Sequence, residues 1–95
     1  MCDVPRSTLV GQTSTLVAAE NELRSGLFIR NLSTGIISLA FCHPAELYKG
    51  ITIYPKEAYS MSRFDYSVGE VYAISNEDNS LITHQEYSDR VRYNW

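Results

Sequence analysis

Three β-prone stretches, residues 26–30, 36–41 and 50–54, carry large apolar residues at every second position, and this spacing predicts β-strands with one buried face. Between the first two stretches, residues 31–35 read Asn-Leu-Ser-Thr-Gly, a composition typical of a turn. Residues 26–41 are therefore expected to form one β-hairpin. The residues expected to face inward along the three stretches are Leu27, Ile29, Ile37, Leu39, Phe41, Ile51 and Ile53.

Strand-like segments recur along most of the chain. Turn-forming residues separate them at intervals of roughly ten residues or a little more, which is typical of a β-sandwich or a barrel. Only residues 18–24 and 44–49 could hold a helical turn, and the first of these is expected to be a polar connection between strands. The strands are expected near Ser14–Ala19, Leu27–Leu32, Ile36–Phe41, Ile51–Tyr54, Ala58–Arg63, Glu70–Ser75 and Leu81–Tyr87.

The strand pattern divides the chain into three regions. Residues 14–87 carry the sandwich domain, residues 1–13 form an N-terminal arm, and residues 88–95 form a C-terminal tail. Within the arm, residues 8–10 are either a short strand or part of the arm itself. The only tryptophan, Trp95, ends the tail, and its ring either folds back on its own domain or docks on another protein. We expect both end segments to contact neighbouring subunits.

Length and charge narrow the classes of function. The 95 residues suffice for one domain with a modest core. A net charge of −3 and a pI of about 5.2 argue against a general nucleic-acid binder, which normally carries a basic face. No apolar run approaches the roughly 20 residues that span a bilayer, and residues 1–6 lack the apolar region of a signal peptide. We expect synthesis in a cytoplasm, where Cys2 and Cys42 need not pair.

Metal-binding or nucleophilic residues are few and do not follow a known spacing. A structural zinc site needs about four ligands, usually in paired spacings, whereas Cys42 and His43 are adjacent and His84 is distant in sequence. We expect Cys42 to be a packed thiol and His43 a loop residue. No Asn or Asp is placed to orient a base for a thiol nucleophile. The sequence therefore predicts no catalytic residue, no metal site and no cofactor.

The acidic residues are not paired in any pattern that predicts acid–base chemistry. Asn31-Leu32-Ser33 matches a glycosylation site, but the predicted turn explains these three residues better. The carboxylates expected to be solvated charges in or beside turns are Asp65, Glu70, Glu77, Asp78 and Glu86.

Seven tyrosines in 95 residues cannot all lie in the centre of one small core. If Ile51 and Ile53 face inward, Tyr54 faces outward, and Phe28 likewise lies opposite its two apolar neighbours. Large rings on the outer faces and rims of a sheet are typical of binding surfaces, although they also serve as cross-strand packing. The residues that we take as candidates for partner binding are Phe28, Tyr54, Tyr72, Tyr93 and Trp95.

A succession of local signals extends from residue 15 to residue 87. A strand and a connection containing Asn21 precede residues 24–35, Arg-Ser-Gly-Leu-Phe-Ile-Arg-Asn-Leu-Ser-Thr-Gly. A strand ending at Phe41, the run Gly-Ile-Thr-Ile at 50–53 with a Pro-containing turn, and Gly-Glu-Val-Tyr-Ala-Ile-Ser at 69–75 follow. Over residues 14–87 the chain resembles a group of small virion proteins of tailed bacteriophages. It departs from them in the arm, in the tail and at residues 42–44, where the group is usually Gly-rich.

The resemblance implies an all-β fold, a compact, jelly-roll-like β-sandwich of about seven to eight short strands. It also implies a non-enzymatic structural protein of the virion, first of all a capsid decoration (cement) protein that stabilises the capsid by contacts across capsomers. The implied partners are the major capsid protein or other virion proteins, and we expect a homo-oligomer that binds neither nucleic acid nor membrane. The alternatives are a tail- or head-fibre-associated module, a carbohydrate-binding β-sandwich module and a small host-directed inhibitor.

Overall fold

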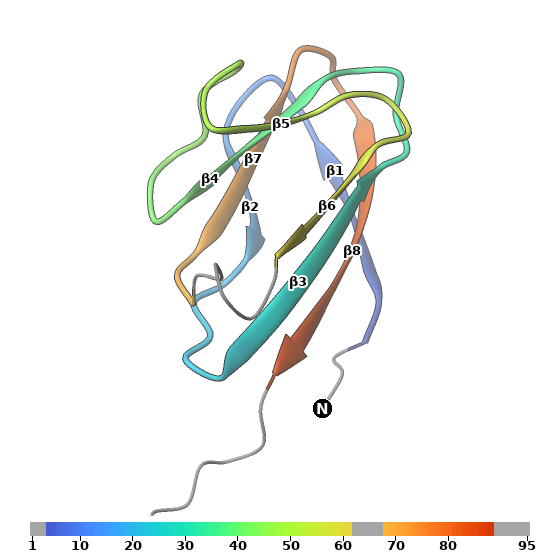
Figure 1. Cartoon of the computed structure of the whole chain (residues 1–95). Coiled ribbons are helices and arrows are strands. Elements are labelled where there is room, and N and C mark those ends of the chain that lie inside the picture. The colour runs from blue at the N-terminus through green and yellow to red at the C-terminus, as the bar shows by residue number, and fades with distance from the viewer. Residues whose placement is uncertain (1–3, 62–67, 89–95) are drawn as a thin grey trace, which may run out of the picture.

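The computed structural model describes residues 4–61 and 68–88, and these residues form two packed antiparallel sheets (Figure 1). All seven predicted strands are present, and the all-β sandwich expected from the sequence is confirmed. The described part of the chain contains no helix long and apolar enough to cross a membrane. The strands are β1 (Arg6–Val10), β2 (Thr15–Ala18), β3 (Arg24–Asn31), β4 (Ile37–Phe41), β5 (Ile51–Ile53), β6 (Ala58–Met61), β7 (Val71–Ser75) and β8 (Ser80–Ser88).

The order of the strands shows how the chain is wound. Sheet A has the order β1-β8-β3-β6, and sheet B has the order β2-β7-β4-β5. The first half of the chain pairs with the second half in reverse: β1 with β8, β2 with β7, β3 with β6 and β4 with β5. A long hairpin whose successive segments alternate between two sheets is the topology of a jelly roll. The sandwich is therefore jelly-roll-like, as the sequence led us to expect.

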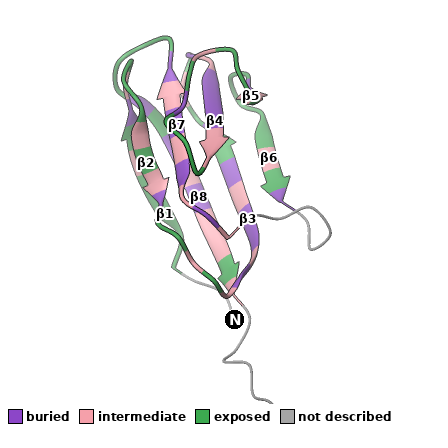
Figure 2. Ribbon diagram, turned by 90° about the vertical axis from the view of Figure 1, so that its left-hand side faces the viewer, coloured by how far each residue is buried: buried purple, intermediate pink, exposed green. Residues whose placement is uncertain are grey.

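The apolar core lies between the two sheets, and buried residues alternate with partly buried or exposed residues along β7 and the first part of β8, whereas β4 begins with three buried residues in succession (Figure 2). Burying apolar side chains from both inner faces is the main favourable term in forming such a sandwich. Of the seven residues predicted to face inward, Phe41 and Ile51 are partly buried against the core. The other five are at most 2% exposed: Leu27, Ile29, Ile37, Leu39 and Ile53.

Residues 6–10 belong to the sandwich as strand β1. Of the two interpretations of residues 8–10, a short strand or part of the arm, the short strand is confirmed. Strand β1 pairs with β8 from Arg6 opposite His84 to Val10 opposite Ser80. Val10 is completely buried in the core, which explains why this segment packs on the domain. The sandwich domain therefore begins earlier than the predicted boundary at residue 14.

The turn expected at residues 31–35 is built around the Asn31 side chain, which is completely buried. Its Oδ1 accepts hydrogen bonds from the N–H and the hydroxyl of Ser33 at 2.9 and 2.6 Å. Its Nδ2 donates to the carbonyl oxygens of Gly35 and Ile53 at 2.8 and 3.1 Å. An amide that is satisfied in this way ties the β3–β4 connection to β5. The β-hairpin predicted for residues 26–41 was wrong, because β3 belongs to sheet A and β4 to sheet B, so this connection crosses between the sheets and the two strands do not pair.

The loop of residues 42–50 lies across the outer face of sheet B. The Tyr48 N–H donates to Ser38 Oγ of β4 at 2.9 Å, and the Ala45 N–H donates to Ser14 Oγ, next to β2, at 2.8 Å. Ser38 and Ala45 are both buried. Because β7 lies between β2 and β4, the loop passes over the middle of this sheet. We call residues 42–50 the covering loop, and its residues 44–49 form no helical turn. Residues 19–23 form the predicted polar connection between strands.

The prediction of a packed thiol at Cys42 was wrong, because Cys42 is a free, exposed cysteine. Strand β4 ends at Phe41, and Cys42 adopts a left-handed backbone conformation with φ of 67° as the chain leaves the sheet. His43 is a loop residue, as predicted.

Candidate functional site

The candidate contact residues do not form one surface. Phe28 lies half-buried on the outer face of sheet A, whereas Tyr72 lies half-buried on the outer face of sheet B. Tyr54 follows β5 and is 51% exposed. Partial burial and the neighbouring Glu70 carboxylate raise the pKa of Tyr72, so its hydroxyl stays protonated. Tyr93 and Trp95 lie outside the described residues.

Phe28 has a neighbour that the sequence analysis missed. Phe28 lies opposite Gln85 of β8, and Gly26 lies opposite Tyr87, so Phe28 and Tyr87 are diagonal neighbours on one face. The Tyr87 ring packs close to Gly26, where an added Cβ would lie only 3.3 Å from Cδ2 of the ring. The Arg30 guanidinium lies 5.9 Å from the centre of the Phe28 ring. Two rings, an amide and a cation therefore lie together on this face.

Exposed leucines continue this face toward its other end. Leu9 of β1 lies directly opposite Leu81 of β8, and the two are 58% and 37% exposed. Leu32 is 50% exposed, and its N–H donates to the Leu81 carbonyl oxygen at 3.0 Å. Apolar side chains that gather on a surface in this way are typical of protein contact sites. The term "sheet A outer face" refers below to the set Leu9, Phe28, Arg30, Leu81, Gln85 and Tyr87.

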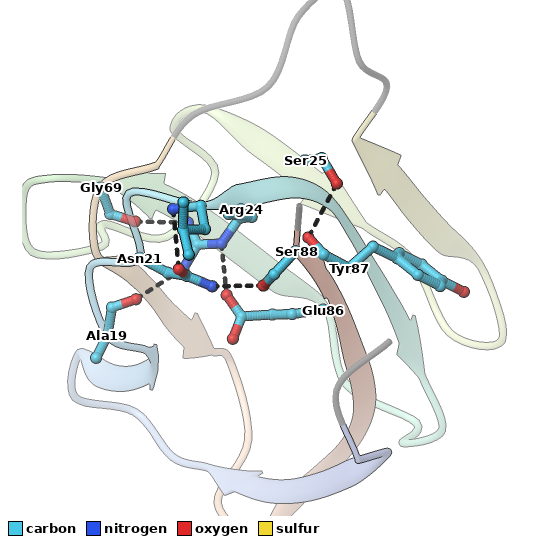
Figure 3. A network of polar contacts seen from close by, with 9 residues as sticks. Ala19, Asn21, Arg24, Ser25, Gly69, Glu86, Tyr87 and Ser88 are labelled. Atoms are coloured by element: carbon cyan, nitrogen blue, oxygen red, sulfur yellow. Dashed lines mark hydrogen bonds and ion pairs between the residues drawn. The ribbon is translucent and has the colours of Figure 1, made fainter. Parts of the chain in front are cut away.

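A buried ion pair lies between the sheets near the end of β8 (Figure 3). Arg24 of β3 is completely buried and pairs through Nε with the Glu86 carboxylate. Its two remaining guanidinium nitrogens donate to the carbonyl oxygens of Gly69 and Ala19, each at 2.7 Å. A guanidinium with all three nitrogens engaged is the arrangement in which this charge can be buried. The network therefore joins β3 and β8 to the connection that follows β2, through Ala19, and to the segment that precedes β7, through Gly69.

Asn21 extends the network to the end of strand β8. Its Nδ2 donates to Ser88 Oγ at 2.9 Å, its Oδ1 accepts from the Leu23 N–H, and its own N–H donates to the Val68 carbonyl oxygen. In Figure 3 the Tyr87 ring points away from these polar groups, as expected for successive residues of a strand.

The prediction that Glu86 is a solvated loop charge was wrong. Glu86 lies within β8, on the same inward side as Ile82 and His84, and pairs with the buried Arg24. The strand period could have revealed the direction of the Glu86 side chain, because every second residue from the apolar Ile82 faces inward. The residues on the other side of β8 are Leu81, Thr83, Gln85 and Tyr87.

A polar slot of about 280 Å³ opens between the two sheets beside this ion pair. His84 lines it and is only 4% exposed, with Nε2 at 2.8 Å from Thr8 Oγ1. Burial, followed by the charge of Arg6, lowers the pKa of His84, while Glu86 opposes the shift. The slot is lined by Val4, Arg6, Val17, Ala18, Ala19, His84, Gln85 and Glu86.

The burial of His84 predicts that the protein loses stability as the pH falls below about 6.5, the usual pKa of histidine. Because the pKa is lower in the folded state, the unfolded chain binds more protons between the folded-state pKa and 6.5, and unfolding is favoured there. The urea midpoint should therefore decrease between pH 7.5 and pH 5.5.

Two substitutions isolate this effect from the titration of carboxylates. His84→Gln should reduce the decrease in midpoint, because the neutral amide does not titrate. His43→Gln, which changes an exposed loop histidine, should leave the decrease as in the parent protein. An identical pH dependence in the parent and in His84→Gln would refute the assignment.

A second hollow, of about 450 Å³, lies between β4, the covering loop and the start of β5. Leu39, Phe41 and Ile51 line its apolar part, whereas Glu46 and Lys49 are exposed and pair with each other at 3.5 Å. Unlike the polar slot, this hollow has no buried polar side chain among its lining residues.

Within residues 4–61 and 68–88, no three His, Cys, Asp or Glu side chains gather as metal ligands. The described residues do assemble the sheet A outer face, the polar slot and the hollow beside β4. Comparison with known proteins finds no matching family model, no matching curated protein and no matching solved structure.

Proposed function

We propose that this chain is a non-enzymatic structural protein of a tailed-bacteriophage virion and acts as a capsid decoration subunit. The observation that carries the proposal is the contrast between the two outer faces of the sandwich. Sheet B is crossed by the covering loop, whereas Leu9, Arg30 and Tyr87 are exposed on the sheet A outer face. A sheet face with exposed leucines and aromatic rings is suited to contact with another protein.

The fold gives a weaker support to the same proposal. Jelly rolls recur in viral capsid proteins, but also in lectin domains and cupins, so the topology alone does not select a function. The succession of signals over residues 14–87 that resembles small virion proteins favours the virion among these classes.

The proposed mechanism needs binding but no chemistry. Each subunit buries its sheet A outer face against neighbouring capsomers, and a ligand that binds only the assembled state stabilises that state by mass action. Many copies on a symmetric shell add their contributions, so that contacts of modest affinity are sufficient.

Matched pairs of substitutions test which face binds the particle. Leu9→Ser with Tyr87→Ser changes the sheet A outer face, and Leu16→Ser with Tyr48→Ser changes exposed residues on the side of sheet B. We expect the first pair to weaken binding to particles that lack the protein by about tenfold or more, since a tyrosine that anchors an interface contributes about 2 kcal/mol and about 1.4 kcal/mol corresponds to tenfold. Co-sedimentation with purified particles measures the affinity.

The second pair is expected to bind as the parent protein does. Equal weakening by both pairs, or the absence of the chain from purified particles, would contradict the proposal. Recovery only in tail or fibre fractions would instead assign the protein to a tail- or head-fibre-associated module, and capture on one host protein would favour the inhibitor.

A carbohydrate-binding module is the second candidate, because Phe28 and Tyr87 share one face with the Gln85 amide. Rings that stack on sugars next to an amide that bonds hydroxyl groups would suit a glycan. Binding of the free protein to neutral oligosaccharides, lost in Phe28→Ala, together with no binding to particles, would select this alternative.

A further inference from the structure

The polar slot places titratable side chains where a sandwich normally has an apolar core. Arg6 and His84 lie directly opposite each other in the β1–β8 pair, and Glu86 follows on the inward side of β8. Val17 and Ala18 of β2 line the slot from the other sheet. One side of the slot is therefore charged and the other side is apolar.

Among the described residues, the charges that line the slot do not cancel. The Glu86 carboxylate is paired with Arg24, and His84 Nε2 is hydrogen-bonded to Thr8 Oγ1. The Arg6 guanidinium has no hydrogen bond or ion pair to any residue of the described ranges 4–61 and 68–88. With His84 neutral, the exposed Arg6 guanidinium is the one charge of the slot that no side chain of the described residues pairs with.

We propose that this slot binds a small organic anion through a carboxylate group that pairs with the Arg6 guanidinium. A carboxylate is planar and singly charged, so it matches both the fork of the guanidinium and the single uncompensated charge. The carbon skeleton of the ligand lies against the methyl groups of Val17 and Ala18. This binding site does not depend on the role proposed for the sheet A outer face.

His84 provides an independent report on occupancy. The charged groups that face it are Arg6 of β1 and Glu86 of its own strand, with Arg24 of β3 behind Glu86, while β2 contributes apolar residues. A carboxylate bound beside Arg6 offsets the positive charge that disfavours imidazolium. Binding should therefore raise the pKa of His84, and by reciprocity a lower pH should tighten binding.

Nuclear magnetic resonance titration of the intact chain tests the site with sodium acetate, glucuronate and N-acetylglycine as probes. Sodium chloride at equal ionic strength and glucose are the controls. We expect saturable shifts of the Arg6, Val17 and His84 signals, in the millimolar range typical of so few ligand atoms, and a rise in the pKa of His84. The ratio of the glucuronate and N-acetylglycine affinities distinguishes an acidic sugar from a peptide carboxyl terminus.

Two variants that each remove one positive charge make the test specific. Arg6→Gln should weaken binding of the probes by about tenfold or more, because the charged hydrogen bonds are lost. Lys56→Gln, in the β5–β6 turn at the opposite edge of the sandwich, should bind as the parent does. Shifts that chloride reproduces, or that persist unchanged in Arg6→Gln with a native spectrum, would overturn the proposal.

Discussion

Replacing Arg24 with alanine is expected to lower the free energy of unfolding by about 3–5 kcal/mol, a large part of the stability of a small domain. The substitution leaves the Glu86 carboxylate between the sheets without its partner. It also removes the donors, each at 2.7 Å, from the carbonyl oxygens of Gly69 and Ala19. Urea unfolding followed by circular dichroism measures the loss.

A double substitution distinguishes the buried charge from the packing around it. Arg24→Met with Glu86→Leu removes both charges and keeps apolar volume, so it should be more stable than Arg24→Ala alone. Lys49→Ala breaks an ion pair whose side chains are 72% and 70% exposed, and it should leave the urea midpoint unchanged. A midpoint in Arg24→Ala equal to that of Lys49→Ala would show that the buried pair is not a structural requirement.

The strands could be predicted because alternation and turn composition are local properties of a sequence. Strand β1 was left undecided because Val10 is its only fully buried residue and Leu9 faces outward, so the segment shows no period. Its partner β8 lies about seventy residues further along the chain, and no local signal announces such a pairing. Alternation also indicates faces, not neighbours, which is why the jelly-roll order was expected from the resemblance alone.

The buried ion pair could not be predicted for a different reason. Glu86 follows the inward alternation of its strand, but an acidic side chain is ordinarily solvated. The position of Arg24 is hidden by a register shift between Arg24 and Gly26, which breaks the period of two just before the apolar part of β3. Without that shift, counting back from Leu27 would place Arg24 on the outer face.

The contact surface was predicted only in part. The outward direction of Phe28 and of Tyr54 followed from alternation and is confirmed. Which rings share a face depends on the order of the strands in each sheet, and this order joins Phe28 to Tyr87 and separates it from Tyr72. The sheet A outer face is therefore a product of topology that composition alone does not encode.

The second large effect is expected in the core, where Leu39→Ala should lower the free energy of unfolding by about 2–5 kcal/mol. Leu39 of β4 is 1% exposed and lies in register between Ala73 of β7 and Ile51 of β5, so its removal leaves a cavity that neighbouring strands cannot fill without moving. The same substitution at Leu16, which is 47% exposed, should change the thermal midpoint little. A cooperative melt of Leu39→Ala at the midpoint of Leu16→Ala would disprove the place of Leu39 in the core and, with it, the register of β4 on which both outer faces depend.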